Sequence, residues 1–512
     1  MSTALTLGAA LAARADADPD GLAVVVPPAR LTYAELHRRA AGAASVFVSH
    51  GVRPGDHVAL LMPNTIELVL SVFGLAFAGA VAVPLNTRSE VPELERSLEH
   101  SEARLVVTVP PVTPERDLVA CARTAAAAAA LHSSVLVIGP DEFAPSETTD
   151  GLPVVSANNV AVLLYTSGTT SAPKGCLISH EAIVRTGTAR IVERRHGTEN
   201  AIWTPCPLFH VGALVPLIGC VATGTPYITT RRFEPGDALR LLAEHRVTIA
   251  LPLFPAFTDA MIDHDDFATT DLSALSQVFT SGPDRNVRRA RAAFAPARLV
   301  SGYGMTEVCG VAASSRLDDS DEERLAWDGS PFDGIEIGIA EPVTGALLPP
   351  GETGEIVVRG YCCFDGYYRD RDATHTAFDA EGWFHTGDVG IHDGCGHVAF
   401  RGRYKDMLKV GGENVSALEV ETFLGALPGV RHVEVVGAPD ERLEEVVAAF
   451  VELEPGAAVT AEDVVAHCAG RLSRFKVPRH VVFVGAGEWP MSSTKVDKGE
   501  LRHRVRAGVG AA

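Results

Sequence analysis

Residues 160–165 (VAVLLY) form a short, uniformly apolar run that leads directly into a segment of glycine, hydroxyl residues and lysine. A run of this length without polar alternation is typical of a strand covered on both faces, as in a parallel sheet. Short apolar runs also occur earlier in the chain, where strand-like residues 57–62 and 80–85 flank an apolar helical pattern over residues 65–79. Short buried strands that alternate with helices predict an α/β fold of layered sheets and helices.

A change in the pattern of strand-like and helical segments near residue 400 divides the chain into two parts. The 512 residues leave room for about two to four domains. Beyond that point the strand-like runs are interspersed with two helix starts, the capping-box pattern of residues 416–419 (SALE) and a second start at residues 460–463 (TAED). We therefore expect a large N-terminal domain over residues 1–402 and a small α+β domain over residues 403–512, with a hinge near Lys405.

Charge and cysteine content exclude several classes of protein. The formal net charge is −20, which would repel a nucleic acid over most of the surface. Nine cysteines are scattered without a CxxC pair, as expected of reduced thiols in a cytoplasmic protein. Because no run of about 20 apolar residues occurs, we expect no membrane-spanning helix.

The segment 165–175 (YTSGTTSAPKG) has the composition of a phosphate-binding loop. Backbone N–H groups, hydroxyls and an ammonium can together surround phosphate oxygens. The segment does not match GxxxxGK[ST], because its spacing and its last residue differ. A polar turn after a strand would have the same composition, so the loop alone leaves both interpretations open.

The loop is one of several motifs that occur in a family order. It is followed by SGYGMTE at 301–307, GWFHTGD at 382–388, RGRYKDMLKVGGEN at 401–414 and TKVDKGEL at 494–501. With these motifs the chain resembles, over nearly its whole length, the adenylate-forming superfamily of acyl-CoA synthetases, peptide-synthetase adenylation domains and luciferases.

The resemblance implies a two-step reaction. ATP and a carboxylic acid would first give an acyl adenylate and pyrophosphate, and the thiol of coenzyme A would then displace AMP. ATP, Mg²⁺ and coenzyme A are the expected cofactors, and a carrier protein is an alternative thiol. The implied architecture is a large domain of sheets and helices with a smaller β subdomain, followed by a small mobile domain. A homodimer is compatible with the sequence.

The resemblance also implies the nucleotide-binding residues. Glu307 would bind Mg²⁺, Tyr303 would pack on the adenine, and Asp388 with Arg403 would bind the ribose hydroxyls. Hard oxygen ligands such as the Glu307 carboxylate suit Mg²⁺. The remaining nucleotide contacts would be Thr166, Ser167, Gly168, Thr169, Thr170 and Lys174 for the phosphates, Ser281, Gly282 and Pro283 near the adenine, Thr306 at the α-phosphate, and Gly304 and Met305 elsewhere on the nucleotide.

At the acid end, the resemblance implies that His210 of PLFHVG faces the substrate carboxylate or gates its pocket. Amino-acid-activating relatives usually carry an aspartate near this position, and this sequence has none there, so an amino acid is not the expected substrate. Apolar residues 251–257, Val308 and Val311 indicate a roomy acyl pocket. We therefore expect a bulky or apolar acid.

The small domain would rotate about Lys405 between the two steps. One orientation would bring Lys495 to the reacting carboxylate, so that Lys495, Glu307, His210 and Thr166 form the implied catalytic set. The other orientation would present residues near the pantetheine arm of coenzyme A, whose passage close to the backbone glycine permits. These residues are Lys409, Gly411, Gly412 and Glu413.

Three positions depart from the family pattern. Ser171 replaces a customary glycine, residues 281–283 (SGP) replace a Gly-Gly-Ala-like run, and Thr494 stands where a glycine usually precedes the catalytic lysine. The loop 490–495 is also one residue short, which removes up to about 3.5 Å of reach. The sequence therefore leaves three hypotheses: a complete acyl-CoA ligase, a ligase weakened in adenylation that mainly converts a supplied acyl adenylate, and a non-catalytic nucleotide-binding protein.

Overall fold

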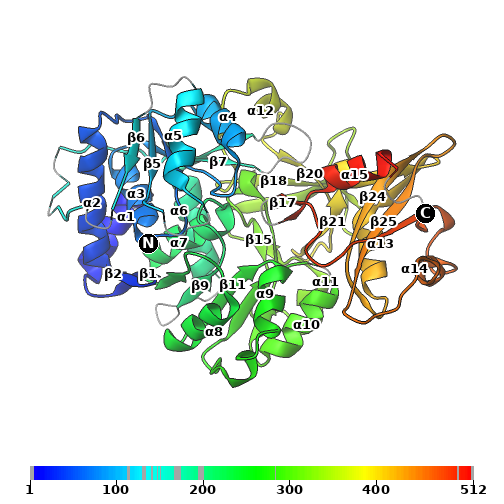
Figure 1. Ribbon diagram of the computed structural model, residues 1–512. Helices are drawn as coiled ribbons and strands as arrows, with labels where there is room; N and C mark the ends of the chain where they lie inside the picture. The colour runs from blue at the N-terminus through cyan, green and yellow to red at the C-terminus, as the bar shows by residue number, and fades with distance from the viewer. Residues whose placement is uncertain are drawn as a thin grey trace.

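The computed structural model describes residues 5–111, 116–129, 134–139, 142–146, 148–149, 151–166, 174–193, 201–282, 284–492 and 495–508. A large layered part carries the N-terminal elements, and a small part at the other end of the molecule carries the last elements of the chain (Figure 1). The strands β17, β18 and β20 lie between them.

Two seven-stranded sheets form the large part, each with a parallel centre and antiparallel pairing at one edge. The first sheet has the order β13 (Arg298–Val300), β12 (Gln277–Thr280), β11 (Ile249–Leu253), β9 (Ile202–Thr204), β10 (Tyr227–Thr229), β1 (Leu22–Val26) and β2 (Ala29–Thr32). The second has the order β19 (Gly366–Tyr367), β8 (Gly175–Ser179), β7 (Val160–Tyr165), β4 (Val81–Pro84), β3 (His57–Leu61), β5 (Leu105–Thr108) and β6 (Ser134–Val137).

Helices cover both sheets, and one apolar core extends through the strands and helices of both. Those of the large part are α1 (Leu7–Ala17), α2 (Tyr33–Ser49), α3 (Ile66–Phe77), α4 (Val91–Ser101), α5 (Leu118–Ala128), α6 (His180–Val192), α7 (Val211–Thr223), α8 (Pro235–Glu244), α9 (Pro255–Ile262), α10 (Asp284–Phe294), α11 (Asp321–Ala326) and α12 (Arg371–Ala377), with 3-10 turns at η1 (Phe267–Thr269) and η2 (Thr306–Val308).

The helices α6 and α7 cross at two glycines. A Cβ atom at Gly187 of α6 would lie 2.8 Å from the backbone nitrogen of Gly219 in α7. No real side chain tolerates that distance, so glycine at this crossing sets how closely the two helices pack.

Smaller sheets link the large part to the small one. A three-stranded sheet contains β14 (Gly302–Tyr303), β15 (Ala313–Ser314) and β16 (Ser330–Pro331). An antiparallel sheet follows with β17 (Ile335–Ala340), β18 (Gly354–Gly360), β20 (Phe384–His392) and β21 (Val398–Arg403). The 3-10 turn η3 (Tyr404–Asp406) comes directly after β21.

The small part contains a five-stranded sheet with its own apolar cores. Its strands are β22 (Met407–Val410), β23 (Glu413–Ser416), β24 (Val430–Asp440), β25 (Glu444–Leu453) and β26 (His480–Phe483). It also has α13 (Ala417–Gly425), α14 (Ala461–Cys468), η4 (Arg474–Lys476) and α15 (Lys498–Arg506), with a short hairpin of β27 (Met491–Ser492) and β28 (Lys495–Val496).

The α/β architecture confirms the fold class expected from the sequence. The strands at 57–62 and 80–85 and the helix between them appear as β3, β4 and α3. The expectation of parallel pairing for residues 160–165 holds on one side only, because β7 pairs parallel with β4 and antiparallel with β8. The domain boundaries expected near Lys405 stay a prediction.

The capping box expected at residues 416–419 forms only in part. The Ser416 hydroxyl accepts a hydrogen bond from the Glu419 N–H at 3.3 Å, but the Glu419 carboxylate accepts bonds from the Lys476 ammonium at 2.6 and 2.7 Å. The Glu419 carboxylate therefore pairs with the Lys476 ammonium and does not cap the N-terminus of the helix. At Thr460 both halves of the box are present.

Among the described residues, no helix combines the length and the apolarity needed to cross a membrane.

Candidate functional site

A cavity of about 1030 Å³ lies where the large and small parts meet. Of the nucleotide-binding residues expected from the sequence, the structure brings Ser281, Gly282, Tyr303, Gly304, Asp388 and Arg403 to its wall. The small part contributes residues of α13, β24 and α15, namely Leu418, Glu421, Thr422, His432, Val433, Glu434 and Lys498. The cavity therefore joins residues that lie up to about two hundred positions apart in the sequence.

Asp388 is the centre of the polar wall. Its side chain is nearly fully buried on β20, opposite Arg403 in the register of β20 with β21. The Arg403 Nε lies 3.0 Å from Oδ1 of Asp388. The Tyr303 hydroxyl donates a 3.0 Å hydrogen bond to Oδ2. Burial, followed by the charge of Asp388, raises the pKa of Tyr303 well above its usual value, so the phenol stays a donor.

An apolar ring and a buried acid that sequence reasoning missed also line this cavity. The ring of Phe400 lies nearly parallel to that of Tyr303, with 6.3 Å between centroids. The Phe400 N–H donates to Oδ2 of Asp328 at 2.7 Å, and burial raises the pKa of Asp328 to about 6. The only feature of the sequence that could have identified Phe400 is its place one residue before the RGRYKD motif.

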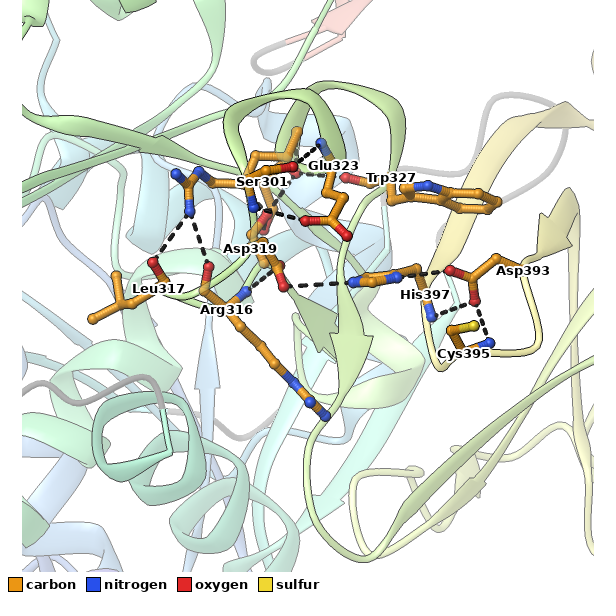
Figure 2. Close-up of polar contacts among 12 residues, drawn as sticks. Ser301, Arg316, Leu317, Asp319, Glu323, Trp327, Asp393, Cys395 and His397 are labelled. Atoms are coloured by element: carbon orange, nitrogen blue, oxygen red, sulfur yellow. Dashed lines mark hydrogen bonds and ion pairs between the residues drawn. The ribbon is translucent and has the colours of Figure 1, made fainter.

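A polar network around His397, shown in Figure 2, lies next to Trp327. The Nδ1 atom of His397 lies 2.7 Å from Oδ2 of Asp393, and Nε2 lies 3.5 Å from Oδ1 of Asp319. Trp327, which lines the cavity, stacks on the imidazole with 6.2 Å between centroids. Although burial opposes the charged form, the bonds to Asp393 and Asp319 raise the pKa of His397. This network fixes the turn between β20 and β21.

Backbone contacts explain the glycines of the motif SGYGMTE. A Cβ atom on Gly304 would collide with the carbonyl group of Gly310, so only glycine allows this loop to fold back on itself. Met305 and Thr306 follow, and the Met305 carbonyl accepts hydrogen bonds from the N–H groups of Val308 and Gly310. The loop therefore ends in η2, which carries Glu307.

Glu307 lies in a second polar group beside the cavity. Its side chain is 6% exposed, and burial raises its pKa. The Tyr367 hydroxyl donates to Oε1 at 3.0 Å, and the Lys174 Nζ lies 4.5 Å from the centre of the Tyr367 ring. The Thr166 N–H donates to the carbonyl oxygen of Lys174 at 3.0 Å. Sequence reasoning missed Tyr367, whose contacts appear only when β19 joins β8.

The residues around Glu307 suit a Mg²⁺ ion that is held mainly by the phosphate oxygens of the nucleotide. Within the described residues there is no cluster of three or more possible metal ligands. Mg²⁺ is commonly held by one or two carboxylates together with phosphate oxygens and water. Tyr367 is the one described side chain that hydrogen-bonds to Glu307, and a carboxylate oxygen is the hard donor that such an ion requires.

Several expected residues lie outside the described part of the chain. These are Ser167, Gly168, Thr169 and Thr170 of the phosphate loop, Pro283, and Ser171 and Thr494 among the departures from the family pattern. Lys495 is described by its backbone alone, which pairs with Ser492 in the hairpin of β27 and β28. The N–H of Asp497 donates to the Pro490 carbonyl oxygen at 2.7 Å and closes the base of that hairpin.

His210 lies directly before α7, with its imidazole 4.7 Å from the Phe209 ring. Leu253, Phe254 and Phe257 remain partly exposed. Val308 and Val311, which we expected to line an acyl pocket, belong to the apolar core, and their contact with an acid stays a prediction.

The four expected coenzyme A contacts do not line the cavity. Gly411 and Gly412 form the turn between β22 and β23, with φ angles of +61° and +87°. Both values lie in the region that favours glycine in a two-residue hairpin turn. Lys409 and Glu413 flank the turn and are exposed. Lys405 lies in η3, and partial burial followed by the charge of Arg403 lowers its pKa.

Two family models match the chain. One, described as AMP-binding enzyme, covers residues 11–368, and one described as AMP-binding enzyme C-terminal domain covers residues 419–495. A feruloyl-CoA synthase from Amycolatopsis sp. is 36% identical over 495 residues, which cover 96% of this chain and 97% of the relative. The long-chain-fatty-acid–CoA ligase FadD13 of Mycobacterium tuberculosis (strain ATCC 25618 / H37Rv) is 32% identical over 520 residues, or 98% of this chain and 99% of the relative.

Solved structures of CoA ligases and related proteins superpose on nearly the whole chain. The crystal structure of ATP-bound MatB from Rhodopseudomonas palustris superposes with a TM-score of 0.89 at 28% identity and covers 99% of this chain and 100% of that one. The anthranilate CoA ligase AuaEII in complex with anthranoyl-AMP superposes with a TM-score of 0.88 at 25% identity, with 99% and 98% covered.

Proposed function

The chain belongs to the AMP-binding enzyme family, and from this premise we propose that it is an AMP-forming ligase that converts a bulky apolar carboxylic acid to its coenzyme A thioester. A carboxylate oxygen of the acid attacks the α-phosphorus of ATP, and pyrophosphate leaves. The thiolate of coenzyme A then attacks the acyl carbon of the adenylate, and AMP leaves. Relatives named for feruloyl and long-chain fatty acyl substrates support this class of acid.

The joint placement of Tyr303, Asp388 and Arg403 on one cavity carries the proposal. The aromatic ring of Tyr303 offers the adenine a flat face, and the ribose hydroxyls can donate to the carboxylate of Asp388. Arg403 orients that carboxylate through the 3.0 Å contact. The site has the polar groups of a nucleoside-binding site on the wall of a large cleft.

The groups around Glu307 suit the triphosphate end of ATP. We assign Glu307 to Mg²⁺, and Thr166, Lys174 and the loop between them to the phosphates. Mg²⁺ would supply positive charge to the leaving pyrophosphate. Lys174 adds an ammonium on the same side, and Thr306 lies one residue from Glu307, near the expected α-phosphate. Lys495 would stabilise the charge that develops during attack.

His210 and its apolar neighbours support a bulky acid rather than an amino acid. Residues 209–211 offer an aromatic ring, an imidazole and a valine, with no carboxylate to bind a substrate ammonium. The rings of Phe254 and Phe257 are partly exposed and, like Val211, pack against the apolar core of the large part. An imidazole beside these groups can donate a hydrogen bond to the substrate carboxylate while the rings pack on its apolar body.

For the second step, we propose that residues 403–512 rotate as a unit about Lys405 and present the turn at Gly411 and Gly412 to the pantetheine arm. The separation of β21 and β22 into different sheets on the two sides of η3 supports a hinge at this place. Dependence on ATP and coenzyme A is compatible with a cytoplasmic location.

A ligase weakened in its first step is the second candidate, favoured by Thr494 and the short loop before Lys495. A catalytic lysine that is misplaced by about 1 Å could lose on the order of a hundredfold in rate. Such an enzyme would still form the thioester from a supplied acyl adenylate.

Pyrophosphate release tests the first candidate. The purified protein is incubated with ATP, Mg²⁺ and a panel of ferulate, benzoate, medium-chain and long-chain fatty acids, with phenylalanine as the amino-acid control. Coenzyme A is then added, and thioesters are detected by mass spectrometry. We expect release with at least one apolar acid and none with phenylalanine. Thioester formed only from a synthetic acyl adenylate would favour the second candidate, and no product from either substrate would contradict both.

A further inference from the structure

The phenol of Tyr367 contacts both charged groups of the proposed phosphate and metal site. Its hydroxyl donates to Oε1 of Glu307 at 3.0 Å. The ammonium of Lys174 lies over its ring face, 4.5 Å from the centroid. Within the described part of the chain, Lys174 and Glu307 form no ion pair with each other. One neutral side chain therefore contacts two opposite charges, the carboxylate through its hydroxyl and the ammonium through its ring face.

Tyr367 is itself held from two sides. In the antiparallel pair of β19 with β8 it lies opposite Cys176, two residues after Lys174. Its N–H donates to Oγ1 of Thr374 at 2.9 Å, and its ring makes an edge contact with Phe364, 4.8 Å between centroids.

The same segment also holds the backbone beneath Glu307. The N–H of Phe364 donates to the Glu307 carbonyl oxygen at 2.9 Å. Residues 364–367 thus connect the strand that starts beside Lys174 with the turn that carries Glu307. The position of the phenol is set by backbone contacts on both sides, so its hydroxyl and its ring are presented in fixed directions.

A direct pair between the two charges would be harmful to binding. Glu307 is 6% exposed, and at such a site of low dielectric constant a carboxylate and an ammonium attract each other strongly. A pair would occupy the oxygens that a metal ion needs and the ammonium that a phosphate needs. The phenol instead gives each group a neutral partner, a hydroxyl for the carboxylate and a π face for the ammonium.

We propose that Tyr367 is a positioning residue that separates Glu307 from Lys174, so that the carboxylate stays open to a divalent cation and the ammonium to the ATP phosphates. This inference rests on the proposed nucleotide site and assigns a function to a residue outside it. The hydroxyl orients the carboxylate, while the ring blocks the ion pair. The two parts of the side chain can therefore be tested separately.

Three variants separate these roles. Tyr367→Phe keeps the ring and removes the hydroxyl, and Tyr367→Leu removes both. Tyr368→Phe is the matched control, because the Tyr368 hydroxyl donates to the Glu102 carboxylate at 2.9 Å, away from the site. The readout is the dissociation constant of ATP without acid, measured once with EDTA and once with saturating Mg²⁺. The ratio of the two constants reports how strongly the protein couples metal to nucleotide, without any turnover.

In Tyr367→Phe we expect the ratio of the two ATP dissociation constants to fall about tenfold, as is usual when a partner of a metal ligand is lost. The dissociation constant of ATP without metal should stay within about twofold of the wild-type value. In Tyr367→Leu we expect metal-free ATP binding to weaken as well, because Lys174 can then pair with Glu307. Adding Lys174→Met to Tyr367→Leu should restore part of the Mg²⁺ coupling. Tyr368→Phe should match the wild type.

Equal ratios for Tyr367→Phe and Tyr368→Phe would overturn the role of the hydroxyl. A double variant no better coupled than Tyr367→Leu would overturn the role of the ring. Thermal unfolding of each variant checks that the fold survives. If the wild type binds MgATP with coupling but releases no pyrophosphate with any acid, the proposed reaction fails while the inference about Tyr367 is still decided by the ratios.

Discussion

The hydroxyl of Tyr303 lies 3.0 Å from Oδ2 of Asp388, and this bond joins the strand β14 of the three-stranded sheet to the strand β20 of the linking sheet. The other oxygen of the same carboxylate lies 3.0 Å from Arg403. Three residues expected to bind one nucleoside thus share one buried carboxylate. A change at Asp388 should affect the orientation of both neighbours as well as the ribose contact.

Replacing Asp388 with Asn should weaken ATP binding more than it slows chemistry. The variant keeps the shape of the side chain but removes the charge that Arg403 pairs with and one acceptor for a ribose hydroxyl. Hydrogen bonds to charged groups contribute about 1.5–3 kcal/mol, so we expect the KM for ATP to rise about 10-fold to 100-fold. Steady-state kinetics at varied ATP measures this change.

Asp263→Asn is the matched control for that experiment. Asp263 also pairs with an arginine, Arg289, but on an exposed surface of the large part. Exposed pairs contribute about 0–1 kcal/mol, so the control should keep its KM. A variant of Asp388 with unchanged KM and reduced kcat would contradict a binding role for this carboxylate.

The network around His397 should make stability depend on pH. The folded pKa of His397 is raised above 6.5, so its stabilising contribution is fully present below the unfolded value and is lost as the pH rises through the folded value. In His397→Gln the charged hydrogen bonds are absent at every pH. At about pH 5.5 we therefore expect the wild type to unfold at a higher temperature than the variant. At about pH 8.5 this difference in unfolding temperature should shrink.

The same variant has a second readout. Because His397 fixes the turn between β20 and β21, its loss should raise the KM for ATP through Asp388 and Arg403 without changing residues that contact the nucleotide. His503→Gln, a change to another histidine on α15, should show neither effect. A constant difference in unfolding temperature across the pH range would contradict the assignment of charge to His397.

The sequence was sufficient for the fold class because it depends on local patterns, and six residues that the resemblance assigned to the nucleotide lie on one cavity. Short apolar runs predicted β3 and β4, and the motif SGYGMTE folds back in a tight turn that requires glycine at Gly304. Tyr367 was missed for a physical reason. Its contacts arise only when β19 pairs with β8, about two hundred residues earlier in the chain, and no local spacing reports such a pairing.

One other expectation was wrong because a tertiary contact engages the side chain. Glu419 was expected to complete a capping box, but its carboxylate accepts hydrogen bonds from the Lys476 ammonium. Val308 and Val311 were expected to line an acyl pocket; both lie in the apolar core, and their contact with an acid stays a prediction. Apolar composition alone does not distinguish a pocket wall from a core.

Insertion of a glycine between Thr494 and Lys495 tests the weakened-adenylation hypothesis. If the short loop misplaces the lysine, one added residue should raise pyrophosphate release with ATP and acid about 10-fold to 100-fold, by analogy with the cost of misplacing a catalytic group. Thioester formation from a supplied acyl adenylate should not change. Insertion of alanine at the same place separates added length from added flexibility.

Equal pyrophosphate release with and without the insertion would show that Lys495 already reaches its target. The departure at Thr494 would then have no effect on the first step, and the complete ligase would be the better description. A loss of release in both insertion variants would indicate that the native hairpin, in which Ser492 pairs with Lys495, already has the required register.

The turn at Gly411 and Gly412 should matter for the second step alone. Gly412 has a φ of +87° and open space around it, so Gly412→Val fails for conformational reasons and not through a steric clash. A β-branched residue at positive φ is strained by about 1–2 kcal/mol, which would distort the turn. We expect thioester formation from a supplied acyl adenylate to fall about tenfold, with pyrophosphate release unchanged. Gly456→Val, at another exposed glycine of positive φ in the small part, controls for general destabilisation, and equal losses in both half-reactions would contradict a role of this turn in thiol access.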